Sequence, residues 1–350
     1  MAEQILFVDG QAGCGKTLLS SVISALDRVE LLTYAYEIEM ICALYFLNKT
    51  SLEASCTQIK LLTDLKIYNL MMGRETNFRP SDLSSVFRYH NPINYFQRLF
   101  QPGDETVPNR ITKNHPILNL ATHDLLSVSE PIFYALKSRC VFIEVVRHPL
   151  YMIRQQKLNM KNLLGNSRDF TVNIEYKSHS LPYYTSGWEE DFVKHSVIEK
   201  SIRCIYELTK RTKVTKTTLK KKFCAQILTI PFELFVLNPE PWMEKICKLL
   251  GTEITSATRN VMLQQNIPRS KIADGIPLDI YQRCGWQPPQ KDASECDELS
   301  TRRSEIINNI SKEAINLLDE ICREYETTYW NPKDNLSINL DDCRLEKALF

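Results

Sequence analysis

The chain has 350 residues, 43% of them hydrophobic, and its 43 basic and 42 acidic side chains leave a formal charge of +1. This composition suffices for a globular core, and the balanced charge gives no overall attraction to nucleic acid or to a membrane surface. The eleven cysteines are odd in number and form no C-x-x-C pair, and the sequence has no signal-like start and no run of 18 apolar residues. These features argue against a disulfide framework, a zinc site and a membrane anchor, so we expect a cytoplasmic protein with reduced thiols.

The first predicted element is a short apolar strand, residues 5–8, that runs directly into a glycine-rich loop. The loop reads GQAGCGKT and has the spacing G-x-x-x-x-G-K-[ST], with an amphipathic helix predicted over residues 18–28. In such a loop the glycines let successive N–H groups point inward, while the helix dipole and the lysine add positive charge. We therefore expect a nucleotide phosphate or a sulfate to be held by Gly13, Cys14, Gly15, Lys16 and Thr17.

The next hundred residues contain one β-prone stretch and several helical ones. Residues 31–36 are β-prone and precede a helical pattern, and residues 53–72 carry apolar side chains at helical spacing. The polar stretch 73–85 contains Arg74 and Arg79 and fits either a surface loop or an acceptor-binding loop. Residues 87–100 carry five aromatic side chains, a pattern that is more often core than a recognition surface.

Three further β-prone runs alternate with helical patterns. Residues 117–122 precede His123, the unbroken apolar run 140–146 precedes Arg147, and residues 225–230 form the last run. This alternation predicts an α/β fold, a parallel sheet of the P-loop type flanked by helices in three α/β/α layers. Because ligands bind beyond the carboxyl ends of parallel strands, we expect Arg147 to lie on the same side as Lys16.

We expect a single domain over residues 1–330, a mobile insertion within 166–186 and a poorly ordered tail over 331–350. Helix is predicted from 189 to 212, followed by a basic run, Lys210 to Lys222, with seven lysines and arginines in thirteen residues. The usual explanation of such a run is a solvated connection, and the alternative is attraction for an anionic substrate.

Most phosphate-loop enzymes that transfer a γ-phosphate hold Mg²⁺ with the loop Ser or Thr and with an acidic residue that ends a second strand. In this chain the run 140–146 ends in Arg147 and the run 225–230 ends in Pro231. A cation therefore stands where the carboxylate is expected, and we predict no metal site.

Three segments, taken in order, resemble the sulfotransferase family, whose sulfuryl donor is 3′-phosphoadenosine 5′-phosphosulfate. They are the N-terminal loop, the segment CVFIEVVRHPLYMIRQQ (140–156) and the segment ILTIPFELFVLNPEPWMEKICKLLG (227–251). The second resembles the family's strand that ends in Arg-x-Pro before a helix. The third resembles its strand, short acidic turn and Asn-Pro-Glu helix that closes on Leu-Gly. The resemblance spans residues 5 to about 285.

Carried over to this sequence, the resemblance implies that the loop surrounds the 5′-phosphosulfate and that Lys16 stabilises the bridging or sulfuryl oxygens. Arg147 would bind the 3′-phosphate. The family usually has a serine eight positions after that arginine, where this chain has Gln155, whose amide can still donate a hydrogen bond. A C-terminal basic loop of the family falls on Arg269, Ser270 and Lys271.

The resemblance also implies a catalytic base. Cytosolic members carry Lys-Thr-His after a strand, and the matching stretch here is Ala121-Thr122-His123, so the histidine is matched and the lysine is not. His123 would remove the proton of the acceptor, while Lys16 and the loop N–H groups stabilise the charge of a loose, in-line transition state. The implied reaction is metal-independent sulfuryl transfer to a hydroxyl or amine.

We expect a small-molecule or carbohydrate acceptor, with residues 87–100, Tyr183 and Tyr184 as candidate lining, although the sequence does not distinguish a carbohydrate from a phenol, a lipid or a peptide. Two alternatives stay open. The loop lysine lies later than is usual in sulfotransferases and fits the nucleotide-kinase consensus, which favours a Mg-ATP-dependent small-molecule or nucleotide kinase. A non-catalytic nucleotide-binding protein would keep the loop without depending on His123.

Overall fold

The computed structural model describes residues 2–162, 164, 165, 167, 169–277, 279, 282 and 294–330. The tail predicted over 331–350 lies outside the described residues. Among the described helices none is both long and apolar enough to cross a membrane.

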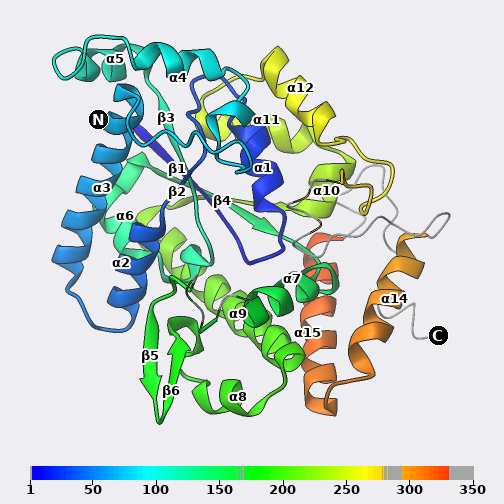
Figure 1. Cartoon of the computed structure of the whole chain (residues 1–350). Coiled ribbons are helices and arrows are strands. Elements are labelled where there is room, and N and C mark those ends of the chain that lie inside the picture. The colour runs from blue at the N-terminus through cyan, green and yellow to red at the C-terminus, as the bar shows by residue number, and fades with distance from the viewer. Residues whose placement is uncertain are drawn as a thin grey trace.

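The centre of the fold is a five-stranded sheet in the order β2-β3-β1-β4-β7 (Figure 1). All four strand pairs are parallel, and the strand that leads into the phosphate loop is the middle one. The prediction of an α/β fold with a parallel sheet is therefore confirmed. The strands are β1 (Gln4–Asp9), β2 (Thr33–Tyr34), β3 (Ile117–Ala121), β4 (Cys140–Val146) and β7 (Gln226–Pro231).

Helices cover both faces of this sheet because successive side chains of a strand point to opposite faces. In β1, Ile5 and Phe7 belong to one buried cluster, and Leu6 and Val8 belong to another. The first cluster includes residues of α2 (Tyr36–Phe46), α3 (Leu52–Met72) and α6 (Glu130–Leu136), and the second includes residues of α1 (Lys16–Ile23), α11 (Glu240–Leu250) and α12 (Ser256–Gln264).

A third buried cluster joins the C-terminal part of the chain to the middle part. Leu150, Ile202 and Leu318 belong to it and come from α7 (Pro149–Asn162), α9 (Val197–Phe223) and α15 (Lys312–Tyr329), three helices that lie together in Figure 1. The remaining helices are α4 (Pro92–Arg98), α5 (Val107–Asn114), α8 (Glu189–Lys194), α10 (Phe232–Leu237) and α14 (Glu295–Ile307), with 3-10 turns η1 (Val86–Arg88), η2 (Leu125–Val128), η3 (Lys137–Arg139) and η4 (Tyr183–Thr185).

The predicted insertion contains regular structure. Strands β5 (Asn173–Tyr176) and β6 (His179–Pro182) form an antiparallel hairpin. Leu181 of this hairpin is buried in a small cluster with Trp188, Phe192 and residues of α9. The hairpin is thus anchored to the helix that follows it.

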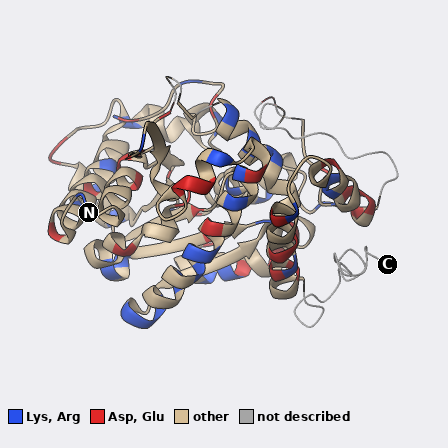
Figure 2. Cartoon of the chain, turned by 90° about the horizontal axis from the view of Figure 1, so that it is seen from below, with Lys and Arg blue, Asp and Glu red and all other residues tan. Residues whose placement is uncertain are grey.

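The basic run is a helix and not a connection, so the prediction that the helix ends near residue 212 is wrong. Helix α9 begins at a capping box made by Ser196 and Glu199 and continues without a break to residue 223. Leu219 lies inside the basic run and is buried, which keeps this part of the helix packed on the protein. Basic and acidic residues are interspersed along the helices drawn in Figure 2.

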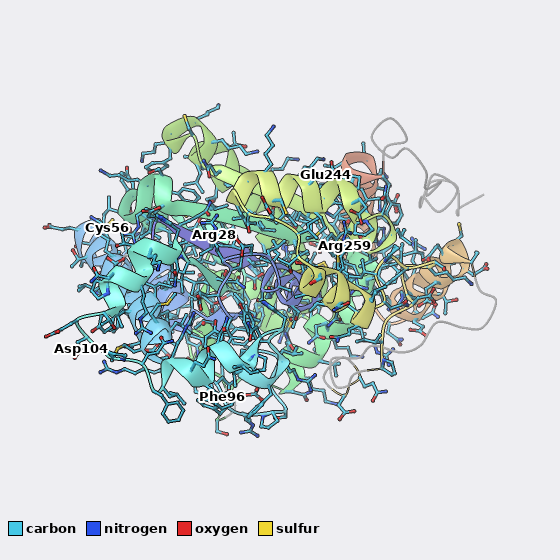
Figure 3. The ribbon with its side chains drawn as sticks, turned by 90° about the horizontal axis from the view of Figure 1, so that it is seen from above. Arg28, Cys56, Phe96, Asp104, Glu244 and Arg259 are labelled. Atoms are coloured by element: carbon cyan, nitrogen blue, oxygen red, sulfur yellow. The ribbon has the colours of Figure 1, made fainter. Side chains whose placement is uncertain are left out.

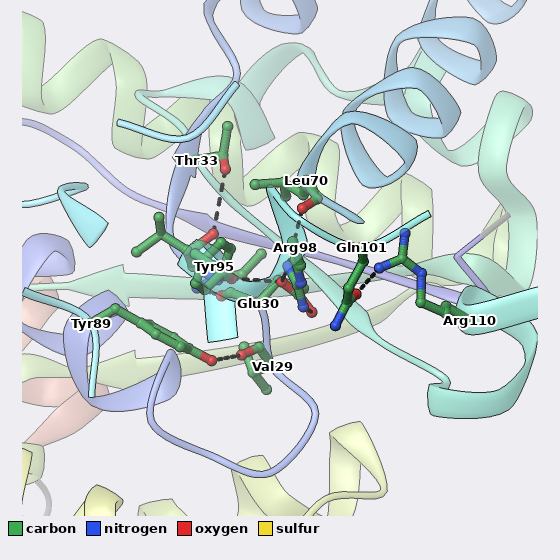
Figure 4. A network of polar contacts seen from close by, with 11 residues as sticks. Val29, Glu30, Thr33, Leu70, Tyr89, Tyr95, Arg98, Gln101 and Arg110 are labelled. Carbon is green, nitrogen blue, oxygen red and sulfur yellow. Dashed lines mark hydrogen bonds and ion pairs between the residues drawn. The ribbon is translucent and has the colours of Figure 1, made fainter. Parts of the chain in front are cut away.

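The segment before β3 is held to the sheet by a buried ion pair (Figure 4). Both Arg98 Nη atoms donate to the Glu30 carboxylate at 2.8 and 2.9 Å, and Tyr95 Oη donates to it at 2.6 Å. Tyr95 is buried as the aromatic pattern predicts, whereas Phe87 and Phe100 are exposed and Phe96 lies at the periphery of the molecule (Figure 3). The aromatic stretch is therefore only partly core.

Candidate active site

The phosphate loop joins the end of β1 to the start of α1 and requires glycine at two of its positions. Gly13 and Gly15 have φ of +86° and +94°, in the left-handed region that side chains with a Cβ disfavour. A Cβ on Gly15 would lie 2.2 Å from the Phe232 ring, and one on Gly13 would lie 2.9 Å from the Gln155 Cβ. The loop is thus packed against α10 and α7, which the sequence places more than 130 residues later.

Lys16 and Cys14 are both buried in this loop. The Lys16 ammonium donates to the carbonyl oxygen of Gly10 at 2.9 Å. Burial raises the pKa of the Cys14 thiol to about 11, although the nearby Lys16 charge acts in the opposite direction. A ligand on the loop would therefore compete with Gly10 for the ammonium and would meet an uncharged thiol at neutral pH.

Arg147 reaches from the end of β4 to the phosphate loop. Its Nη1 donates to the carbonyl oxygen of Gly13 at 3.1 Å, and its guanidinium carbon lies 4.9 and 4.4 Å from the ring centroids of Tyr151 and Phe232. Its Nε is buried, lies 4.0 Å from Glu233 Oε1 and has no hydrogen-bond partner among the described residues. Burial lowers the pKa of this guanidinium, so the site would gain from an anion.

Glu233 organises the surroundings of this arginine. Its Oε1 accepts from the backbone N–H of His148 at 2.9 Å, and its Oε2 accepts from Tyr325 Oη. His148 is fully buried, and its Nε2 lies 3.1 Å from Glu326 Oε1. Helix α15 therefore supports the turn that carries Arg147, a contribution that the sequence analysis missed because it comes from about 180 residues away.

The other predicted donor-binding residues lie at different distances from this centre. Gln155 packs against Gly13, and its Nε2 donates to Asn159. The guanidinium carbon of Arg269 lies 5.6 Å from the centroid of the Phe232 ring, the same ring that Arg147 contacts. Ser270 is exposed, and the backbone N–H of Lys271 donates to Asp274.

His123 lies just beyond β3 and is oriented by a glutamate of α2. Its Nδ1 lies 3.1 Å from Glu39 Oε1, which also accepts the backbone N–H of His123 at 2.7 Å. Because a carboxylate only accepts, Nδ1 carries the hydrogen in the neutral ring and Nε2 is left as the basic nitrogen. The rings of Tyr34 and Tyr36 lie parallel to the imidazole, with centroids 6.0 Å away.

His123 lines a cavity of about 360 Å³, which we call the histidine cavity. Tyr183 and Tyr184 line this cavity, whereas residues 87–100 do not. Whether it binds an acceptor stays a prediction. Its lining is formed by Ala12, Tyr36, Glu39, Met40, Ala43, His123, Asp124, Gln156, Asn159, Met160, Leu164, Asp169, Phe170, Thr171, Val172, Tyr183, Tyr184 and Cys204.

A second cavity, of about 290 Å³, is also lined by residues of the phosphate loop. Gly10, Cys14 and Arg147 line it, together with residues of α15. Three lysines of the basic run also line it, and two of them are paired with carboxylates, Lys213 with Glu324 and Lys216 with Glu144. Part of the basic run therefore lies beside the loop without being free of acidic partners.

Asp124 belongs to the lining of both cavities and was missed in the sequence. Its backbone is left-handed, with φ of +56°, and its Oδ1 is buried without a hydrogen-bond partner among the described residues. Burial raises the pKa of its carboxyl to about 7, Lys16 lowers it, and Asp9 raises it further. Its position three residues after the strand next to β1 is the signal that could have identified it.

The fold and the site define a phosphate-loop α/β protein with a strand-end arginine at the loop. No family model matches the chain, and no curated protein matches it in sequence. Among solved structures, the chain is similar to the sulfotransferase domain from the curacin biosynthetic pathway, with 11% identity, 91% of this chain and 97% of the other covered, and a TM-score of 0.44.

It is also similar to the sulfotransferase STF9 from Mycobacterium avium, with 11% identity, coverage of 94% and 77%, and a TM-score of 0.41. A mouse sulfotransferase, SULT7A1 complexed with PAP, gives 11% identity, coverage of 91% and 90%, and a TM-score of 0.34. Similarity at this level carries no weight for activity, so the functional argument rests on the residues of the site.

Proposed function

We propose that this chain is a sulfotransferase that moves a sulfuryl group from 3′-phosphoadenosine 5′-phosphosulfate to a hydroxyl or amine. The observation that carries the proposal is the hydrogen bond from Arg147 to Gly13, which joins a strand-end arginine to the phosphate loop. A donor with two separate phosphate groups needs a second anion site beside the loop, and the buried Nε of Arg147, which has no hydrogen-bond partner among the described residues, suits one.

The cationic residues of the site fall into two groups, one for each end of the donor that carries phosphate. Lys16 and the N–H groups of residues 13–17 would hold the 5′-phosphosulfate, while Arg147, with Arg269 near the same Phe232 ring, would hold the 3′-phosphate. During transfer the bond from sulfur to the bridging phosphate oxygen breaks and a bond from sulfur to the acceptor oxygen or nitrogen forms. The leaving group is 3′-phosphoadenosine 5′-phosphate, whose developing negative charge the loop and Lys16 stabilise.

His123 would accept the proton that the acceptor loses. Glu39 holds the Nδ1 hydrogen, so Nε2 is the atom that takes this proton, and the same carboxylate stabilises the imidazolium that results. The pairing of His123 with Glu39 follows the general pattern in which a third group orients a catalytic base. In this scheme Glu39 is a positioning residue.

One observation favours the alternative of a Mg-ATP-dependent kinase. Asp124 follows β3, the strand beside β1, and interacts electrostatically with Lys16, so a carboxylate does lie near the loop, although it does not end β4 or β7. The other strand carboxylates are engaged: Asp9 accepts from the backbone N–H groups of Leu125 and Leu126. In the described part of the chain no group of three or more His, Cys, Asp or Glu could hold a metal ion.

The proposal is tested by turnover in EDTA. The purified protein is incubated with 3′-phosphoadenosine 5′-phosphosulfate and a phenol or amine acceptor, and release of 3′-phosphoadenosine 5′-phosphate is followed by chromatography. We expect metal-independent release that requires the acceptor and falls by about 10²- to 10⁴-fold in His123→Ala. Activity only with ATP and Mg²⁺ would establish the kinase instead. If the wild type shows no turnover and His123→Ala binds the nucleotide as the wild type does, the chain is a non-catalytic binding protein.

A further inference from the structure

The histidine cavity has an uneven distribution of charge. Three carboxylates line it, those of Glu39, Asp124 and Asp169, and no Lys or Arg does among the described residues. The rest of the lining is mostly aromatic or apolar, including Phe170, Tyr183 and Tyr184. A cavity of this kind disfavours an anion, because no lining cation compensates the cost of taking the anion out of water.

The three carboxylates differ in what they already bind. Asp169 accepts the backbone N–H groups of Gly165 and Thr171, and Glu39 is committed to His123. Asp124 Oδ1 alone is buried with no hydrogen-bond partner in the part of the chain that the structure describes. This oxygen is therefore the acceptor that a bound ammonium group would satisfy.

Two cations outside the lining, Lys16 and Arg211, donate hydrogen bonds to backbone carbonyl oxygens. The Lys16 ammonium donates to Gly10, and Arg211 donates to the carbonyl oxygens of Tyr184 and Ser186. Both interact electrostatically with Asp124, but neither lines the histidine cavity. The lining is thus left with net negative charge, next to aromatic rings that also attract cations.

We propose that the histidine cavity selects an acceptor with a protonated amine on a small aromatic or apolar body, and that Asp124 receives the amine. This inference rests on the proposed function, because it assigns the acceptor of that reaction. A volume of about 360 Å³ lies at the lower end of the range for ligand pockets, about 300 to 1,000 Å³, which favours a small molecule over a polysaccharide. Sulfated or carboxylated carbohydrates are excluded on charge as well.

The test is calorimetric binding of three phenols of similar shape and different charge, in EDTA at about pH 8 and with 3′-phosphoadenosine 5′-phosphate present. The probes are tyramine, 4-ethylphenol and 3-(4-hydroxyphenyl)propionate. We expect tyramine to bind about tenfold or more tightly than 4-ethylphenol, as one charge interaction provides, and the propionate to bind most weakly. A propionate that binds as tightly as tyramine, or the absence of any preference for tyramine, would overturn the inference.

Asp124→Asn removes the charge and suits the left-handed backbone, where Asn is well tolerated. We expect the preference for tyramine over 4-ethylphenol to fall to about threefold or less in this variant. The matched control is Asp104→Asn, an exposed aspartate outside both cavities, which should keep the wild-type preference. An unchanged preference for tyramine in Asp124→Asn would contradict the role of Asp124. The same preference measured in Glu39→Gln reports the effect of a second lining charge.

Failure of the proposed function is distinguishable from failure of this inference. Binding of 3′-phosphoadenosine 5′-phosphate is measured first and without phenols. If the protein does not bind this nucleotide, the result counts against the proposed sulfotransferase function and not against the acceptor inference. The phenol titrations are then repeated without nucleotide, and their order reports on the cavity whether or not turnover occurs.

Discussion

Arg147 Nη1 donates to the carbonyl oxygen of Gly13 at 3.1 Å, so the end of β4 and the phosphate loop are joined by a direct hydrogen bond. The guanidinium also lies over the rings of Tyr151 and Phe232. A planar, stacked arginine is suited to two-pronged recognition of a phosphate, which a lysine cannot reproduce.

Arg147→Lys should therefore weaken binding of 3′-phosphoadenosine 5′-phosphate by about 10- to 100-fold although the charge is kept. Adenosine 5′-phosphosulfate lacks the 3′-phosphate, and its affinity should change little. Calorimetry with both nucleotides measures the difference. An equal loss of affinity for both nucleotides would show that the arginine supports the loop and does not contact the 3′-phosphate.

Glu39→Gln should lower kcat by about 10- to 100-fold with little change in the dissociation constant of the nucleotide. The amide can still accept from His123, but it no longer stabilises the imidazolium formed during proton transfer. Steady-state kinetics and nucleotide binding, measured on the same preparation, separate the two effects. Glu37→Gln, on the same helix and outside both cavities, is the control that should keep wild-type kcat.

Gly15→Ala should destabilise the protein by about 2 to 4 kcal/mol, because the new Cβ meets the Phe232 ring and the backbone stays left-handed. Gly187→Ala separates these two causes, since Gly187 has a similar φ of +96° with no atom within 4 Å of an added Cβ. We expect about 1 to 2 kcal/mol for this control by urea denaturation. Equal losses at the two positions would rule out the clash.

Asp124 should make the stability of the protein depend on pH. Its pKa is raised from an ordinary value of 3.8 to about 7, so between these values the folded state holds a proton that the unfolded chain has released. The free energy of unfolding therefore falls as pH rises through this range. Burial is the main cause, Asp9 and Glu39 add to it, and Lys16 and Arg211 oppose it.

Asp124→Asn removes this titration. We compare the difference in free energy of unfolding, variant minus wild type, at two pH values. This difference should be more positive at about pH 8 than at about pH 4 by roughly 2 to 4 kcal/mol. Urea denaturation of both proteins at the two pH values gives the comparison. A difference that does not change with pH would show that the carboxyl of Asp124 titrates normally.

Arg98→Met should destabilise the protein by about 3 to 5 kcal/mol, because it leaves the buried carboxylate of Glu30 without its charged partner (Figure 4). The double variant Glu30→Gln with Arg98→Met should recover part of this loss. Arg259→Met is the control, since its ion pair with Glu240 is half exposed, and it should cost less than about 1 kcal/mol. A loss from Arg98→Met no larger than that control would contradict the account.

The sequence predicts the centre of the sheet well. The apolar runs at 5–8 and 140–146 match β1 and β4 because strands buried on both faces have a strong and unambiguous pattern. The nearness of Arg147 to the loop follows from the common edge at which parallel strands end. These parts of the site depend on local pattern and on one topological rule.

Other parts of the site depend on tertiary contacts that no local pattern reports. Glu39 meets His123 across 84 residues, and Tyr325 meets Glu233 across 92. The basic run is predicted as a connection because its charges mask the buried Leu219, which continues the helical face of α9. Asp124 lies three residues beyond the end of β3, so it does not end an apolar run as the metal-binding carboxylate of a phosphate-loop enzyme is expected to.

The most direct measurement is calorimetric titration of the purified protein in EDTA, with 3′-phosphoadenosine 5′-phosphate and separately with ATP, on the wild type and on Arg147→Ala. We expect tight, metal-independent binding of the 3′-phosphorylated nucleotide, loss of this binding in Arg147→Ala and no binding of ATP. Binding of ATP alone, and only after Mg²⁺ is restored, would rule out the sulfotransferase and assign the site to a kinase.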